Sequence, residues 1–152
     1  MTLRDRLQAA LKDAMRAREV DRLSTLRLVN AAIKDREIAL RAEAGEPEVD
    51  DPEILGILGK LVKQRQESAR AFEEGGRLEL AEKELAEVKV IEEFLPRQLS
   101  PDEIEAAVAA AIADLGATSI RDMGRVMAAL KARHTGQMDF GVVGPMVKDR
   151  LG

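Results

Sequence analysis

The residues of this chain with the clearest chemical potential are lysines and arginines that recur at helical spacing. Lys60, Lys63 and Arg70 are three and seven residues apart, so they share one face of a helix. Arg27 and Lys34 form a second such face. Cationic faces bind the phosphates of RNA, or they pair with carboxylates of a neighbouring helix. Spacing alone favours pairing with the acids that follow in the chain, Glu79, Glu82, Glu84 and Glu87.

Residue types that serve as nucleophiles or metal ligands are scarce. The chain has no cysteine, which excludes thiol nucleophiles, disulfides and thiolate metal sites. Ser24 and Ser68 lie in helical patterns and not in the Gly/Ser-rich loop of an amidase. The single histidine, His134, follows Lys131 and Arg133, where positive charge suits the end of a helix. We therefore expect no catalytic residue, no metal and no cofactor.

The elements that position these residues are all predicted to be helices. Good helix formers dominate, apolar residues recur at helical spacing, and no segment is typical of a strand. We expect an all-α fold with an N-terminal bundle of about four helices and a small three-helix C-terminal domain. Pro96 separates the two parts, 1–96 and 97–152. The predicted helices cover about residues 3–14, 23–40, 52–74, 77–95, 101–115, 120–134 and 139–151.

Local signals mark several helix ends. Thr2 with Asp5 and Ser100 with Glu103 are spaced as capping boxes. Asp51 before a proline predicts the cap of the third helix, and 44–48 is a predicted loop. The last helix has two possible starts. Asp139 can cap it, or it begins at Pro145 after an irregular glycine-containing lead, because a proline within a helix removes a hydrogen bond.

Composition restricts the class of protein further. With 152 residues, of which 45% are hydrophobic, the chain can build one domain or two small ones. It lacks an apolar run long enough for a membrane span and an N-terminal signal peptide, so we expect a cytoplasmic protein without a membrane partner. The net charge of −4 argues against a general nucleic-acid coat. With three Phe and no Trp or Tyr, any RNA is expected to be recognised by shape and backbone.

Six short motifs lie along the chain. Two are in its C-terminal part, at 123–127 (MGRVM) and 136–139 (GQMD). The others are 23–27 (LSTLR), 63–68 (KQRQES), 76–84 (GRLELAEKE) and 94–99 (FLPRQL). Together these motifs resemble the GatB/YqeY family. The first two are similar to the C-terminal tail of a subunit of the tRNA-dependent amidotransferases, and the other four to the small YqeY-like proteins.

This resemblance implies an N-terminal helical domain and a C-terminal three-helix domain. In the amidotransferase the similar tail contacts tRNA and performs no chemistry. Carried over to this chain, the motif makes Arg125 and Lys131 the tRNA-facing residues. The remaining motif residues are expected to be structural. Met123 and Met127 are predicted in the core, Gly124 at a close helix approach and Gly136 at a left-handed helix end.

Three functions are compatible with these observations. The leading one is a non-catalytic tRNA-binding or accessory module related to the tail of glutamyl/aspartyl-tRNA amidotransferase. The second is an adapter that binds a tRNA synthetase or an amidotransferase subunit through an apolar helix face. The third is a carbon–nitrogen ligase with glutamine as amide donor, a label often given to relatives, for which the residues supply no nucleophile arrangement.

Overall fold

The protein is helical throughout the part that the structure describes. A computed structural model describes residues 1–44 and 49–152, so most of the predicted loop, residues 45–48, lies outside it. The described residues contain seven α-helices, one short 3-10 helix and no strand, which confirms the all-α prediction. The helices are α1 (Leu3–Ala17), α2 (Val20–Ala44), α3 (Asp51–Glu74), α4 (Leu78–Glu92), α5 (Pro101–Leu115), η1 (Ile120–Asp122), α6 (Met123–Arg133) and α7 (Phe140–Leu151).

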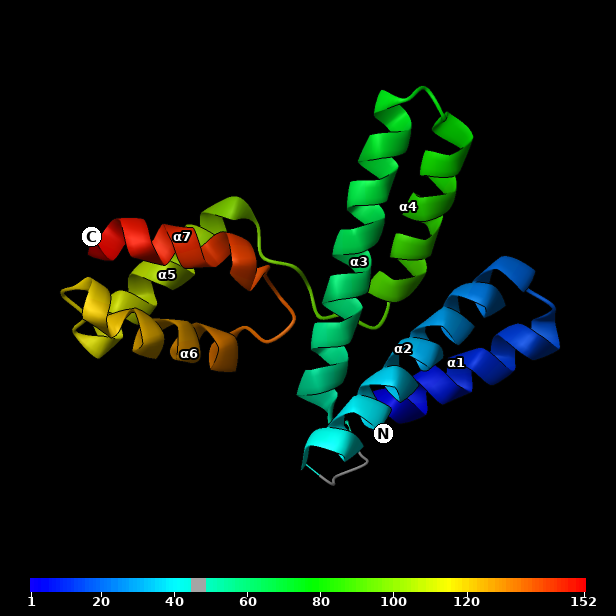
Figure 1. Cartoon of the computed structure of the whole chain (residues 1–152), viewed down its shortest axis with the longest axis horizontal. Coiled ribbons are helices and arrows are strands. Elements are labelled where there is room, and N and C mark those ends of the chain that lie inside the picture. The colour runs from blue at the N-terminus through cyan, green and yellow to red at the C-terminus, as the bar shows by residue number, and fades with distance from the viewer. Residues whose placement is uncertain (45–48) are drawn as a thin grey trace. The chain divides into compact units, whose positions relative to one another are not determined.

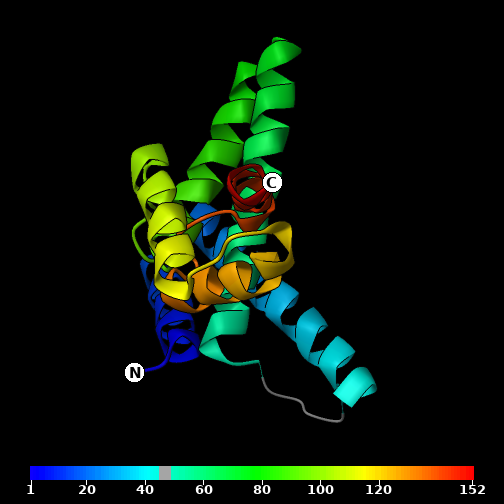
Figure 2. The same cartoon turned by 90° about the vertical axis from the view of Figure 1, so that its left-hand side faces the viewer.

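The chain divides into two compact units, Met1–Leu95 and Pro96–Gly152. The first unit consists of two antiparallel helical hairpins, α1–α2 and α3–α4 (Figure 1). In both views the end of the α3–α4 hairpin that carries its turn extends away from α1 and α2 (Figure 2). The hairpin therefore packs on α1 and α2 through one half and leaves the other half projecting.

The core of the first unit joins all four of its helices. Leu26, Ile54, Leu58 and Ile91 are fully buried there, and each such side chain stabilises the fold by roughly 1.5–3 kcal/mol. Arginines from α1 and α2 hold the C-terminal end of α4. The Arg22 guanidinium donates to both carboxylate oxygens of Glu93, over 2.5 and 3.1 Å. Arg6 donates to the Glu93 carbonyl over 3.3 Å and lies 5.7 Å from the centre of the Phe94 ring.

The second unit has a separate core among α5, α6 and α7. Its fully buried residues include Val108, Val126, Leu130, Val143 and Val147. The two methionines of the MGRVM motif are half-buried and pack against this cluster.

The helix caps agree with the sequence signals at two positions and differ at one. Both predicted capping boxes, at Thr2 and Ser100, are present. The cap of α3 is Asp50, whose carboxylate accepts from the Glu53 amide over 3.0 Å, so the assignment to Asp51 was wrong by one residue. Asp51 is the first helical residue. Its carboxylate accepts from the amide of Leu3 over 3.3 Å and thereby links the N-terminal ends of α1 and α3.

One motif residue, Gly124, differs from its predicted role, and the structure decides between the two possible starts of the last helix. Gly124 is exposed, and a Cβ atom built on it would meet nothing within 4 Å, so it does not serve a close helix approach. The last helix begins at Phe140 with Asp139 as its cap, and Pro145 lies inside it. The proline removes the hydrogen bond to the carbonyl of Gly141, and that exposed residue leaves its carbonyl open to water. By contrast, Gly136 has the expected left-handed backbone, with φ +74°.

Candidate nucleic-acid interface

The outward face of α2 carries the first group of predicted RNA-binding residues. Arg27 and Lys34 are exposed and form no ion pair with any described residue. The same seven-residue interval leads on to Arg41, which is also exposed and also lacks an ion pair in residues 1–44 and 49–152. Arg41 was not among the residues predicted from the sequence, although the repeated seven-residue interval indicates it.

The outward face of α3 carries the second group. Lys60, Lys63 and Arg70 are all exposed on this helix. Lys60 and Arg70 make no ion pair within the described part of the chain. Glu67 shares the face, which is therefore cationic but not uniformly so.

Among the α4 acids expected to neutralise these cations, none forms an ion pair with Lys60 or Arg70 in the described part of the chain. Glu87 pairs with Arg65 over 2.8 Å, with both side chains largely buried between the two helices. Arg65 is five residues from both Lys60 and Arg70, or about 140° around the helix axis, so it faces α4 while they face outward. Glu79 and Glu82 are exposed and form no ion pair with the described residues. The predicted pairing thus occurs at a neighbouring arginine and leaves Lys60 and Arg70 open.

The third group, Arg125 and Lys131 on α6, does not form a pair. Six residues along a helix correspond to about 120° around its axis, so the two side chains point in different directions. Arg125 is bound to Asp122 over 2.7 Å. Asp122 also accepts from the amide of Thr118, and this bond, followed by Arg125, lowers the pKa of Asp122. Lys131 is exposed and has no ion-pair partner among the described residues.

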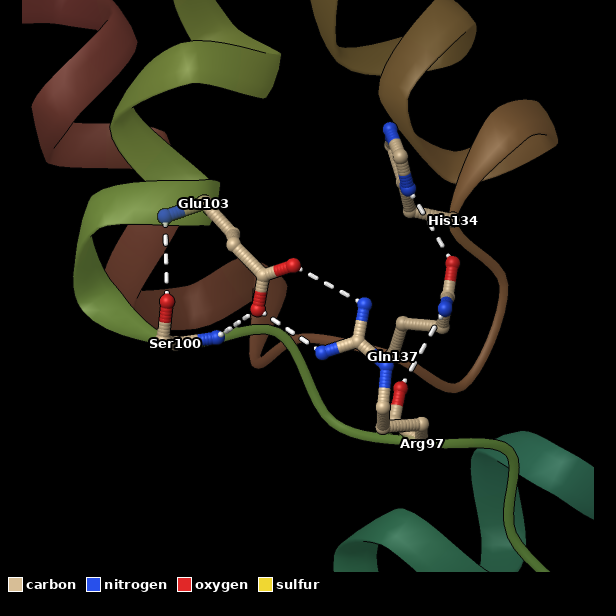
Figure 3. Close-up of polar contacts among 5 residues, drawn as sticks. All are labelled: Arg97, Ser100, Glu103, His134 and Gln137. Carbon is tan, nitrogen blue, oxygen red and sulfur yellow. Dashed lines mark hydrogen bonds and ion pairs between the residues drawn. The ribbon is translucent and has the colours of Figure 1, made fainter.

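A polar cluster joins the start of the second unit to α5 (Figure 3). Arg97 donates to both oxygens of Glu103, over 2.8 and 2.9 Å. Glu103 also accepts from the amide of Ser100 over 2.9 Å and completes the capping box of α5. The Arg97 bond, helped by Ser100, lowers the pKa of Glu103 to about 2. This carboxylate is therefore ionised and engaged, which is the state of a structural group and not of a general acid.

The GQMD motif supplies the other half of this cluster. The side chain of Gln137 donates to the carbonyl of Arg97 over 3.2 Å, and its Oε1 lies 3.1 Å from Nδ1 of His134, the C-cap of α6. The Gln137 carbonyl accepts from the amide of Leu99 over 2.9 Å. These contacts hold residues 97–99 against the α6–α7 loop and give His134 a structural partner (Figure 3).

Aromatic side chains are not displayed for stacking. Phe94 is buried in the first core, and Phe72 and Phe140 are half-buried. Single-stranded nucleic acid is commonly held on exposed aromatic rings. The three cationic groups therefore suit phosphates better than unstacked bases.

The serine hydroxyls and acidic side chains of the described residues form no recognisable reaction centre. Ser24 and Ser68 lie on exposed helix positions, and neither hydroxyl forms a hydrogen bond with another described residue. Within residues 1–44 and 49–152, no three His, Asp or Glu side chains come together as metal ligands. No described helix combines the length and apolarity needed to cross a bilayer.

Comparison with known proteins shows the family. The model for "Yqey-like protein" matches residues 4–151, nearly the whole chain. The chain belongs to the YqeY-like family. This confirms the resemblance drawn from the motifs in both units.

Several fungal proteins are similar to this YqeY-like chain. It is 31% identical over 94 residues to an uncharacterized protein of Schizosaccharomyces pombe, covering 62% of this chain and 72% of that one. It is 33% identical over 112 residues to "Altered inheritance of mitochondria protein 41, mitochondrial" of Kluyveromyces lactis, covering 72% of this chain but 58% of the relative. The protein of the same name in Pyrenophora tritici-repentis is 32% identical over 134 residues, with 84% and 71% covered.

Proposed function

We propose that this YqeY-like protein is a non-catalytic module that binds tRNA through its phosphate backbone, as an accessory to tRNA-charging enzymes. One observation carries the proposal. Cations that face outward on α2 and α3 lack carboxylate partners in the described chain, namely Arg27, Lys34, Lys60 and Arg70, whereas Arg65, which faces α4, is neutralised. Unpaired surface cations release counterions from a nucleic acid when they bind it.

The C-terminal unit has a smaller part in this proposal. Lys131 is exposed and available, whereas Arg125 is already bound to Asp122 and would have to exchange that partner for a phosphate. We expect the outward cations of α2 and α3 to provide most of the affinity, with Lys131 as an additional contact.

The test is a fluorescence titration of labelled tRNA with the full chain at low salt. Saturable binding that an excess of unlabelled tRNA reverses is the expected result. A single-stranded RNA of equal length and low structure is the matched competitor, and it should compete less well because no aromatic platform is displayed. An unchanged signal at the highest protein concentration would refute the proposal.

An adapter role is a second candidate, because α4 leaves apolar residues uncovered. Leu78 is 61% exposed and Leu85 is 39% exposed. They are seven residues apart and share one face of the projecting hairpin. The expected partner is a subunit of a tRNA synthetase or an amidotransferase. Purification of a tagged chain, with identification of the RNA and the proteins bound to it, distinguishes the two roles. In the adapter role, the double variant Leu78→Ser, Leu85→Ser should lose its protein partner. Binding of tRNA should not change in this variant.

The location of the protein in the cell is also a proposal. We propose a cytoplasmic location for this chain; the word mitochondrial is part of the names of the Kluyveromyces lactis and Pyrenophora tritici-repentis relatives. The match spans little more than half of the Kluyveromyces lactis relative, so that protein has additional sequence outside the region shared with this chain.

A further inference from the structure

Many arginines of the first unit are engaged within the fold. Four of them bind a carboxylate of a different helix or helix end, and they thereby join the helices of this unit. The pairs are Arg4–Glu37, Arg22–Glu93, Arg36–Glu53 and Arg65–Glu87. A ligand that recruited any of these cations would have to break a contact that supports the fold.

Three cations on α2 have no such role. Arg27, Lys34 and Arg41 are exposed and lack an ion pair with the described residues. Seven residues are close to two helical turns, so the three side chains lie within about 40° of one another and repeat every 10.5 Å or so. They form a straight row about 21 Å long, which we call the α2 row.

The acids nearest to Lys34 among the described residues point away from the α2 row or are engaged elsewhere. Asp35, the acid next to Lys34, points about 100° away from it around the axis. Glu37 is bound to Arg4. Ala31, a small exposed residue, lies between Arg27 and Lys34, and exposed Ser24 lies about one turn before Arg27. Ile38, which is 65% exposed, lies between Lys34 and Arg41.

We infer that the α2 row binds the phosphate backbone of a double-helical RNA stem, an inference that rests on the proposed function and names its site. A rigid line of cations suits a rigid polyanion, and an RNA helix presents phosphates and 2′-hydroxyl groups across a wide, shallow minor groove. The neutral hydroxyl of Ser24 is exposed beside the row and can bond to such groups.

Two other occupants suit the α2 row less well. A single strand needs exposed aromatic rings, and the phenylalanines of this chain are buried or half-buried. An interfacial membrane helix presents its broad apolar face to lipid. The broad apolar face of α2, with Leu26, Val29 and Ile33, is instead buried in the core, and Ile38 is the large apolar residue of the row.

The experiment compares two variants of the full chain that change the net charge equally. One reverses the α2 row (Arg27→Glu, Lys34→Glu, Arg41→Glu). The control reverses three exposed lysines on α1 and α4 (Lys12→Glu, Lys83→Glu, Lys89→Glu), which have no ion pair among the described residues. Far-UV circular dichroism checks that both fold. If reversal perturbs the fold, the corresponding glutamine variants replace both sets.

The readout is the affinity for a labelled RNA stem-loop and its dependence on salt. Reversal of the α2 row should weaken binding about tenfold or more at low salt and lower the slope of log affinity against log salt by about 3, and the control should stay close to the parent. A DNA duplex of the same sequence should compete more weakly than the stem.

Failure of the inference and failure of the proposed function give different results. If the parent chain binds tRNA and the two variants weaken it equally, the α2 row is not the site, while the proposed function stands. If the parent binds no tRNA, both fail. DNA that competes as well as RNA would overturn the assignment to RNA. If the parent chain binds vesicles of phosphatidylcholine and phosphatidylglycerol but binds no RNA, the ligand of the α2 row is lipid. That result would overturn the inference.

Discussion

At the scale of single residues, the fate of each cation depends on which way its helix position faces. Arg65 points toward α4 and is neutralised by Glu87, whereas Arg70, five residues later, points outward and is open. One arginine is therefore engaged within the fold, while the other has no ion pair among the described residues. The spacing of charges in the sequence predicts the shared faces but not which face meets the neighbouring acids.

This division predicts a clean separation of stability from binding. Arg65→Ala should lower the free energy of unfolding by about 2 kcal/mol, because it leaves the largely buried carboxylate of Glu87 without its partner. Arg70→Ala should change stability by less than about 0.5 kcal/mol and weaken tRNA binding. Urea unfolding and RNA titration of both variants provide the two readouts. Equal stability of the two variants would contradict the assigned roles.

The carboxylate of Glu103 predicts a pH effect with a definite sign. Its pKa falls from 4.5 to about 2 on folding, so its contribution to stability is complete above the unfolded pKa and is lost as pH drops toward 2. Thermal unfolding of the parent should therefore lose more stability between about pH 5 and pH 2 than that of Glu103→Gln. Glu105→Gln, an exposed neighbour on the same helix, is the control and should follow the parent.

At the scale of helices and loops, the capping and glycine signals account for most of the observed boundaries. Thr2 and Ser100 begin helices because their hydroxyls accept backbone amides that the first turn cannot otherwise satisfy. Pro145 shows the limit of such rules. Sequence rules alone allow a helix start there, but the carbonyl freed by the proline belongs to an exposed glycine, so the helix continues through it.

The two motif glycines should respond to substitution in opposite directions. Gly136→Ala should destabilise the chain by about 1 kcal/mol, because its φ of +74° is strained for any residue with a Cβ atom. Gly124→Ala should stabilise it by about 0.5 kcal/mol, because the added methyl group meets open space and raises helix propensity. Urea unfolding of both variants measures the difference. If Gly124→Ala lowered the free energy of unfolding, that result would support the predicted close helix approach at Gly124 and contradict the open space that the structure shows there.

At the scale of the whole molecule, the sequence was sufficient for the fold class and the family but not for the site. Helical periodicity and composition predict an all-α chain, and motifs spread along its length indicate the YqeY-like family. The pairing of Glu87 with Arg65 instead of Lys60 depends on how α3 packs against α4, which no local pattern specifies. Arg41, the third member of the α2 row, follows Lys34 at the same seven-residue interval in the sequence. Only the structure shows that it is exposed and has no ion pair among the described residues.

The overall charge of −4 opposes the proposed binding to tRNA. A chain with an acidic balance is repelled by nucleic acid at long range, so any affinity must come from local faces such as the α2 row and the outward cations of α3. Such binding weakens as salt rises, with a slope that grows with the number of phosphate contacts.

The most direct test is the affinity of the full chain for tRNA measured at about 50 mM and about 200 mM salt. If three phosphate contacts are made, the affinity should fall about 40-fold across this range, and more if α3 and Lys131 add contacts. Absence of binding at the lower salt, or an affinity that salt leaves unchanged, would contradict the proposed function.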